Sequence, residues 1–138
     1  MSTSDDAPDT PARRRPPPIE RFAGPERVVD LPAVTAALRE EPAAAAAPHG
    51  HRQTAVLHRG PVRMVVFAFD AGGRLPTHTA DGLVTIHVLR GALTVTTPEA
   101  HHPLGAGAVL VLDPRIPHDV VAAEPADMLL TVHLHAVA

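Results

Sequence analysis

The sequence lacks several residue types on which common enzyme mechanisms depend. It contains no cysteine, lysine, tyrosine or tryptophan, and its serines are confined to Ser2 and Ser4. A disulfide framework, a thiolate nucleophile and Schiff-base chemistry are therefore excluded. A serine triad is excluded too, because both serines lie in the N-terminal tail. What remains is 10 histidines, the abundant groups able to bind a transition metal or titrate near neutral pH.

The charge and the hydropathy of the chain limit the classes of partner that we expect it to bind. The formal net charge is -3 and there is no tyrosine or tryptophan on which bases could stack, so we do not expect nucleic acid as a partner. No apolar run is long enough to cross a bilayer, so we do not expect a membrane protein. The N-terminus carries charge and proline instead of the apolar core of a secretory signal. Together with the lack of cysteine, this predicts a cytoplasmic protein.

The composition changes twice along the 138 residues, which are enough for one domain. Residues 1–27 are rich in Pro, Asp and Arg with no apolar period, so we expect a disordered tail. Residues 28–48 predict a short helix, with Asp30 as its N-cap and Pro42 at its end, followed by an alanine-rich connector. Residues 49–138 then change to a strand-like period and form the predicted β-barrel domain.

The last segment reads as short strands separated by glycine and proline. A hairpin is expected around Gly60, and Pro98 to Pro103 is expected to form a loop. The predicted strands cover residues 53–58, 62–69, 83–89, 93–96, 109–112, 118–122 and 128–135. Strands of this length and spacing predict an all-β sandwich or barrel.

Two of these strands are apolar on both faces. Residues 65–69 read VVFAF and residues 109–112 read VLVL, whereas successive side chains of a strand point to opposite sides. One face can line the barrel, and the other needs a cover. One short helix covers little area, so we expect a homodimer whose sheets pack against each other.

The spacing of residues 72–91 resembles the first motif of the cupin family. The series is Gly72, five residues, His78, one residue, Ala80, three residues, Val84, six residues, Gly91. The family motif has His at the position of Ala80 and Glu at the position of Val84. Every spacing agrees, while these two residue types do not.

A second stretch resembles the second cupin motif. Its series is Gly107, five residues, Asp113, one residue, Arg115, two residues, His118. The family has Pro at 113, Gly at 115 and Asn at the position of Ala122. The resemblance covers roughly residues 50–138. Over this range the wider pattern is similar to that of small single-domain bacterial cupins. It implies a jelly-roll β-barrel with one short N-terminal helix.

The resemblance also implies a metal, because cupins commonly bind Mn, Fe, Ni, Cu or Zn through three His and one Glu. Carried over residue by residue, only His78 and His118 are kept as candidate metal ligands. A catalytic divalent ion normally needs about three protein ligands, so a site of two would bind Fe, Mn, Ni or Zn weakly. His87 is expected to point away from the barrel on a regular strand. The sequence leaves open whether His133 or His135 reaches the interior.

Two functions therefore stay open. The first is a binding module that holds a small organic molecule in the barrel, against the ligand-binding residues His78, Val84, Ile86, Val88 and His118. The second is a metal-dependent enzyme, of oxygenase or isomerase type, that uses His78, His118 and a substitute third ligand. Arg115 is a further candidate, as an anion anchor in a turn beside the barrel mouth.

Overall fold

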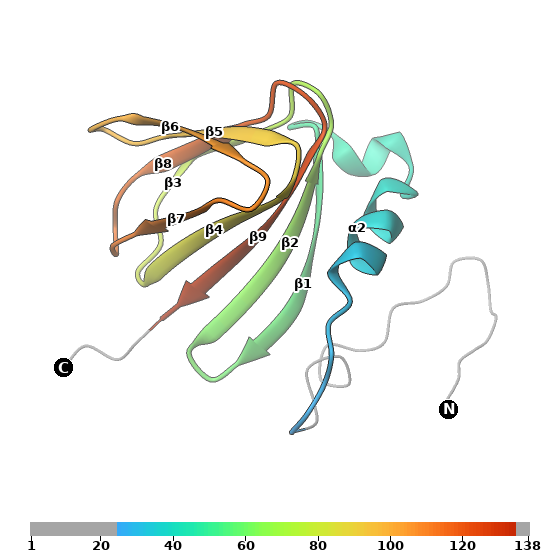
Figure 1. The fold of residues 1–138 in the computed structure, drawn as a ribbon, viewed down its shortest axis with the longest axis horizontal. Coiled ribbons are helices and arrows are strands. Elements are labelled where there is room, and N and C mark those ends of the chain that lie inside the picture. The colour runs from blue at the N-terminus through green and yellow to red at the C-terminus, as the bar shows by residue number, and fades with distance from the viewer. Residues whose placement is uncertain (1–24, 135–138) are drawn as a thin grey trace.

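A computed structural model describes residues 25–134 of the chain (Figure 1). The expected tail over residues 1–27 lies almost entirely outside this range. The described elements are α2 (Leu31–Arg39), a 3-10 helix η1 (Ala43–Ala46), β1 (His51–Arg59), β2 (Val62–Phe69), β3 (Arg74–His78), β4 (Leu83–Arg90), β5 (Ala92–Thr96), β6 (His101–Gly105), β7 (Val109–Leu112), β8 (His118–Val121) and β9 (Ala126–His133). No described helix has the length and hydrophobicity to cross a membrane.

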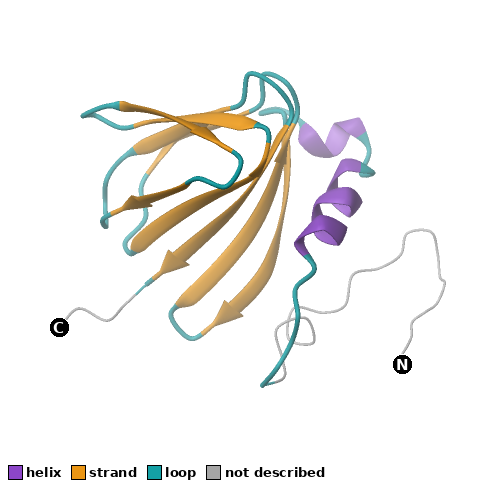
Figure 2. Cartoon of the chain, in the orientation of Figure 1, coloured by secondary structure: helices purple, strands orange, loops and turns teal. Residues whose placement is uncertain are grey.

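The strands form two antiparallel sheets that face each other. One sheet has the order β1-β2-β9-β4-β7 and the other has the order β3-β8-β5-β6. Neighbouring strands are mostly distant in sequence, as in a jelly roll, and the two sheets close around a common interior (Figure 2). The predicted all-β jelly-roll barrel with one short helix is therefore confirmed.

The interior of the barrel is packed with aliphatic side chains. β4 shows the expected alternation, with Val84, Ile86 and Val88 at 3%, 0% and 0% exposure. Phe67 and Phe69 of β2 join the same cluster, with ring centroids 5.9 Å apart. The cluster draws on both sheets, so burial of its apolar surface is the main force that closes the barrel.

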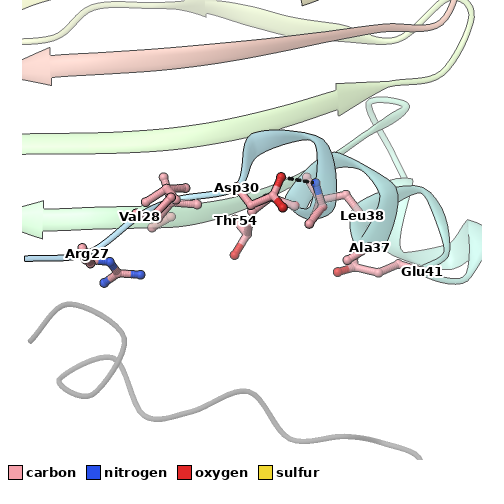
Figure 3. A pocket seen from close by; sticks show the side chains of 12 residues that line it. Arg27, Val28, Asp30, Ala37, Leu38, Glu41 and Thr54 are labelled. Atoms are coloured by element: carbon pink, nitrogen blue, oxygen red, sulfur yellow. Dashed lines mark hydrogen bonds between the residues drawn. The ribbon is translucent and has the colours of Figure 1, made fainter.

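Helix α2 covers part of the outer face of the five-stranded sheet, beside β1 in Figure 1. Asp30 accepts a hydrogen bond from the Ala33 N–H at 3.1 Å, which confirms the predicted N-cap. Leu38 of the helix then packs on Val56 and Val66 in a second apolar cluster. A groove of about 400 Å³ remains between α2, residues 27–30 and β1 (Figure 3).

A buried carboxylate links α2 to the sheet. Asp127 of β9 is 3% exposed and accepts from two arginines. Arg39 of α2 reaches one carboxylate oxygen, and the Arg90 Nε lies 3.0 Å from the other. Arg39 also donates to the Ala126 carbonyl at 3.3 Å. The ion pairs therefore join the end of the helix to the edge of the core.

Two strands differ from the sequence prediction. Residues 98–103 were expected to form a loop, whereas His101–Gly105 form strand β6, which pairs with β5. The expectation was wrong because proline usually interrupts strands, but Pro103 lies in a strand at the edge of its sheet, where proline is tolerated. Strand β3 was not expected either, because Pro76 lies within it at an irregularity of its pairing with β8.

Candidate functional site

The two histidines that fit the motifs lie side by side. His78 is the last residue of β3 and His118 is the first residue of β8, and they are cross-strand partners. Their ring centroids are 4.3 Å apart, with planes tilted by 57°. His118 is 2% exposed and His78 is half-buried. The antiparallel register therefore brings together two side chains that are 40 positions apart in the sequence.

Each imidazole is oriented by a backbone carbonyl two residues before it. His78 Nδ1 lies 2.9 Å from the Pro76 oxygen, and His118 Nδ1 lies 3.0 Å from the Ile116 oxygen. A carbonyl only accepts, so Nδ1 carries the hydrogen in both rings and Nε2 of a neutral ring has a lone pair. The His118 Nε2 atom is buried and has no hydrogen-bond partner among the described residues. The pair therefore presents an unused acceptor.

The surroundings of His118 favour its neutral form. Burial lowers its pKa below the ordinary value of 6.5, and the nearby His78 acts in the same direction. The hydrogen bond to Ile116 and the charge of Asp119 oppose these effects without reversing them. At neutral pH the His118 ring is therefore uncharged, and its Nε2 can accept a hydrogen bond or bind a cation.

The lowered pKa predicts how stability depends on pH. The unfolded chain takes up a proton at His118 near pH 6.5, whereas the folded chain resists protonation until a lower pH. The contribution of His118 to the free energy of unfolding is thus complete above pH 6.5 and decreases as the pH falls toward the folded-state pKa. Between about pH 7.5 and about pH 5, the free energy of unfolding should fall more steeply for the natural chain than for His118→Gln. Urea unfolding at each pH measures both slopes, and equal slopes would contradict the prediction.

Two connections surround the histidine pair at this end of the barrel. They are residues 79–82, which join β3 to β4, and residues 113–117, which join β7 to β8; we call them the mouth loops. The Arg115 N–H donates to the Ala80 carbonyl at 2.8 Å and ties the two loops together. They lie close to each other at the left of Figure 1. Gly82 packs against β9, since a Cβ there would lie 2.2 Å from the His133 oxygen.

The other residues that the sequence singled out lie at different depths. Val84, Ile86 and Val88 face the interior, and Val84 is nearest the mouth loops because it pairs with Leu112, at the end of β7. His87 lies on the opposite face of β4, as the alternation predicts. His133 is exposed at the end of β9. His135 lies outside the described residues.

These residues do not fit a resident metal ion. Within residues 25–134, no group of three or more His, Asp or Glu side chains is placed to hold one. Ala80 and Val84, at the positions where the motif has its other two ligands, carry no donor atom. Two imidazoles fall short of the about three protein ligands of a typical catalytic site. The described residues therefore do not form a complete metal site.

Sequence reasoning missed the groups that orient the site. The carbonyls of Pro76 and Ile116 fix the tautomers, but every residue has a carbonyl and no pattern marks these two. The contact between the mouth loops also has no sequence signal. The proline that lies close before each histidine, Pro76 or Pro117, shows only that the backbone is extended there.

Comparison with known proteins agrees with this architecture. An RmlC-like cupin protein from Desulfovibrio desulfuricans is 31% identical with a TM-score of 0.57, over 61% of this chain and 82% of that one. A cupin superfamily protein from Desulfitobacterium hafniense is 14% identical with a TM-score of 0.65, over 83% of this chain and 96% of that one. KdgF from a Halomonas species is 24% identical with a TM-score of 0.57, over 63% of this chain and 81% of that one.

No protein of curated function matches the chain. The family model described as "Cupin domain" matches residues 65–134, which contain both histidines, the interior face of β4 and the mouth loops. With its jelly-roll topology and the spacing of both motifs, the chain belongs to the cupin family.

Proposed function

We propose that this protein binds a small organic molecule at the mouth of its barrel, without a resident metal. The ligand has an apolar body and one hydrogen-bond donor. His78 and His118 contact the polar group, and Val84 contacts the apolar body, with Ile86 and Val88 in the layers below. The observation that carries the proposal is the buried Nε2 of His118, which has no partner among the described residues.

The state of His118 determines the polarity of the ligand. A buried acceptor without a partner is costly, of the order of 1–3 kcal/mol, so a group that satisfies it gains affinity. Because burial keeps the ring neutral, Nε2 accepts, and the ligand must supply an O–H or N–H. Val84, where the family motif has a carboxylate, favours an apolar body.

A matched pair of probes tests this proposal. Cresol (4-methylphenol) supplies an apolar ring and a hydroxyl, and 4-methylanisole has a similar shape without the donor. We expect 4-methylphenol to raise the melting temperature in a dose-dependent way and 4-methylanisole to have a smaller effect. Isothermal titration calorimetry then gives the two dissociation constants. Equal affinity for the two probes would contradict a role for the free acceptor.

The histidines also offer a matched control. His78→Ala and His118→Ala should each lower the affinity for 4-methylphenol, whereas His87→Ala should leave it unchanged. His87 lies on the outer face of β4, in the opposite sheet from the histidine pair, so it reports nonspecific effects of losing an imidazole. A loss of affinity in His87→Ala as large as that in His118→Ala would place the ligand elsewhere.

A metal-dependent enzyme is the second candidate. One observation favours it: both rings hold their hydrogen on Nδ1, as metal-binding histidines do when a carbonyl orients them. A third ligand would then have to come from outside residues 25–134. Elemental analysis of untagged protein decides between the candidates. A stoichiometric transition metal that is lost in His78→Ala and His118→Ala would favour the metal-dependent enzyme over the metal-free binding module.

We further propose that the protein is a homodimer. Helix α2 covers the β1–β2 side of the outer sheet face, while Val109 and Val111 of β7 are 53% and 56% exposed on its other side. Their neighbours across the ladder are His87 and Thr85 of β4. Burial of this patch against a second copy supports the proposal. Val111→Lys should shift the mass seen by analytical ultracentrifugation from dimer to monomer, and an unchanged mass would contradict it.

A cytoplasmic location is the remaining proposal, and the absence of cysteine supports it. Cell fractionation tests it, and recovery of the protein outside the cytoplasm would overturn it.

A further inference from the structure

We infer that Arg115 is an anion-binding residue, and that the ligand at the mouth is a hydroxy acid. The inference rests on the proposed function and makes it more specific. The hydroxyl contacts the histidine pair, and the carboxylate contacts the Arg115 guanidinium. The starting observation is the backbone of Arg115 itself.

Arg115 has a backbone conformation that does not suit arginine. Its φ is +66°, while every other described residue with a positive φ is a glycine. Pro114 and Arg115 are the two residues of the turn that follows β7. In a turn with proline at the second position and a positive φ at the third, the third residue is typically glycine. A side chain with a Cβ is strained there, so its presence indicates a role that glycine could not fill.

The fold places this arginine beside the histidine pair. Its N–H is bonded to the Ala80 carbonyl at 2.8 Å, two residues after His78, and it lies three residues before His118. The next side chain, Ile116, packs against the core, whereas Arg115 is exposed at the rim. The turn is therefore anchored on both sides, and the exposed side chain of Arg115 starts from backbone that is bonded to the loop following His78.

The charges of the mouth loops leave Arg115 available. It is the single cation on these loops, and no ion pair joins it to another residue within the described range 25–134. Asp81 and Asp113 lie on the same loops and are exposed. These carboxylates weaken the local positive potential, so an anion is held there by the paired N–H groups of the guanidinium and not by net charge.

The two contacts together define a class of ligand. The His118 Nδ1 donates to the Ile116 carbonyl, which leaves Nε2 as an acceptor without a partner among the described residues, so this atom suits a hydroxyl and not a carboxylate. The guanidinium only donates, so it suits a carboxylate. A molecule that satisfies both sites carries a hydroxyl at one end and a carboxylate at the other, separated by an apolar body.

The test uses 4-hydroxybenzoate and its neutral analogue 4-hydroxybenzamide, with affinities measured by calorimetry. For the natural chain, we expect the acid to bind about 10-fold more tightly than the amide. Arg115→Gly should remove this difference. The same variant should melt at a higher temperature, by about 4 °C or more, because glycine relieves the strained turn.

Arg115→Ala separates the two effects, because it removes the guanidinium but keeps a Cβ at a positive φ. It should lose the preference for the acid without the gain in melting temperature. Equal affinity for acid and amide, or a preference for the acid that persists in Arg115→Gly, would overturn this inference and leave the proposed function standing. Failure of both probes and of 4-methylphenol to bind would overturn the two together.

Discussion

The double variant Ala80→His with Val84→Glu should bind Ni²⁺ or Zn²⁺ more than 100-fold more tightly than the natural chain. The two positions complete the spacing of the first motif, and the orienting carbonyls of His78 and His118 are already in place. Loss of a single group that merely orients a ligand costs about 10–100-fold in metal affinity, so two added direct ligands should exceed this range. Calorimetry with each metal salt measures the change.

The inward face of β4 provides the control for this variant. Ala80→His with Ile86→Glu also places a carboxylate in the interior, but one layer deeper, because Val84 and Ile86 share a face. This control variant should be destabilised by its buried carboxylate, as the first variant is, but should not gain metal affinity. If both variants bind metal equally, or neither does, then the absence of ligands at Ala80 and Val84 is not what prevents a resident metal.

Removal of both arginines that pair with Asp127 should lower the free energy of unfolding by about 3–5 kcal/mol. In Arg39→Gln with Arg90→Gln, a carboxylate that is 3% exposed loses both of its ion-pair partners. Asp127→Asn alone should cost less, because the arginines left behind are 27% and 55% exposed and can be solvated. Chemical denaturation measures each variant.

The triple variant decides whether the buried charge is the cause. Adding Asp127→Asn to the double arginine variant neutralises the orphaned group, so we expect it to recover much of the lost stability. A triple variant that is less stable than the double would show that the arginines act by packing. Arg52, which pairs with Asp70 away from this cluster at 3.2 Å, provides a comparison outside the network.

The fold was largely predictable because its signals are local. The Asp30 cap, the alternation along β4 and the turn at Gly60 each follow from residues close in sequence, and each was confirmed. The prediction was wrong for residues 98–103, where Pro103 was taken to exclude a strand. Whether proline is tolerated depends on whether the strand lies at an edge, and sheet order is a property of the whole chain.

The site was predictable only in part. Motif spacing placed His78 and His118 together, and the register of β3 with β8 does bring them into contact. Sequence could not show that Ile116 fixes the tautomer of His118, because that depends on side-chain orientation. It identified Arg115 as a turn residue without revealing its positive φ. Such features arise from tertiary contacts.

The position of β6 at the edge of the smaller sheet has a consequence for the behaviour of the protein at high concentration. An unpaired strand edge can recruit the same edge of another molecule and so begin a fibril. Pro103 adds no N–H donor to this strand, and a proline on an edge strand opposes such pairing. The proline that argued against a strand in the sequence thus also protects the folded molecule from aggregation through this edge.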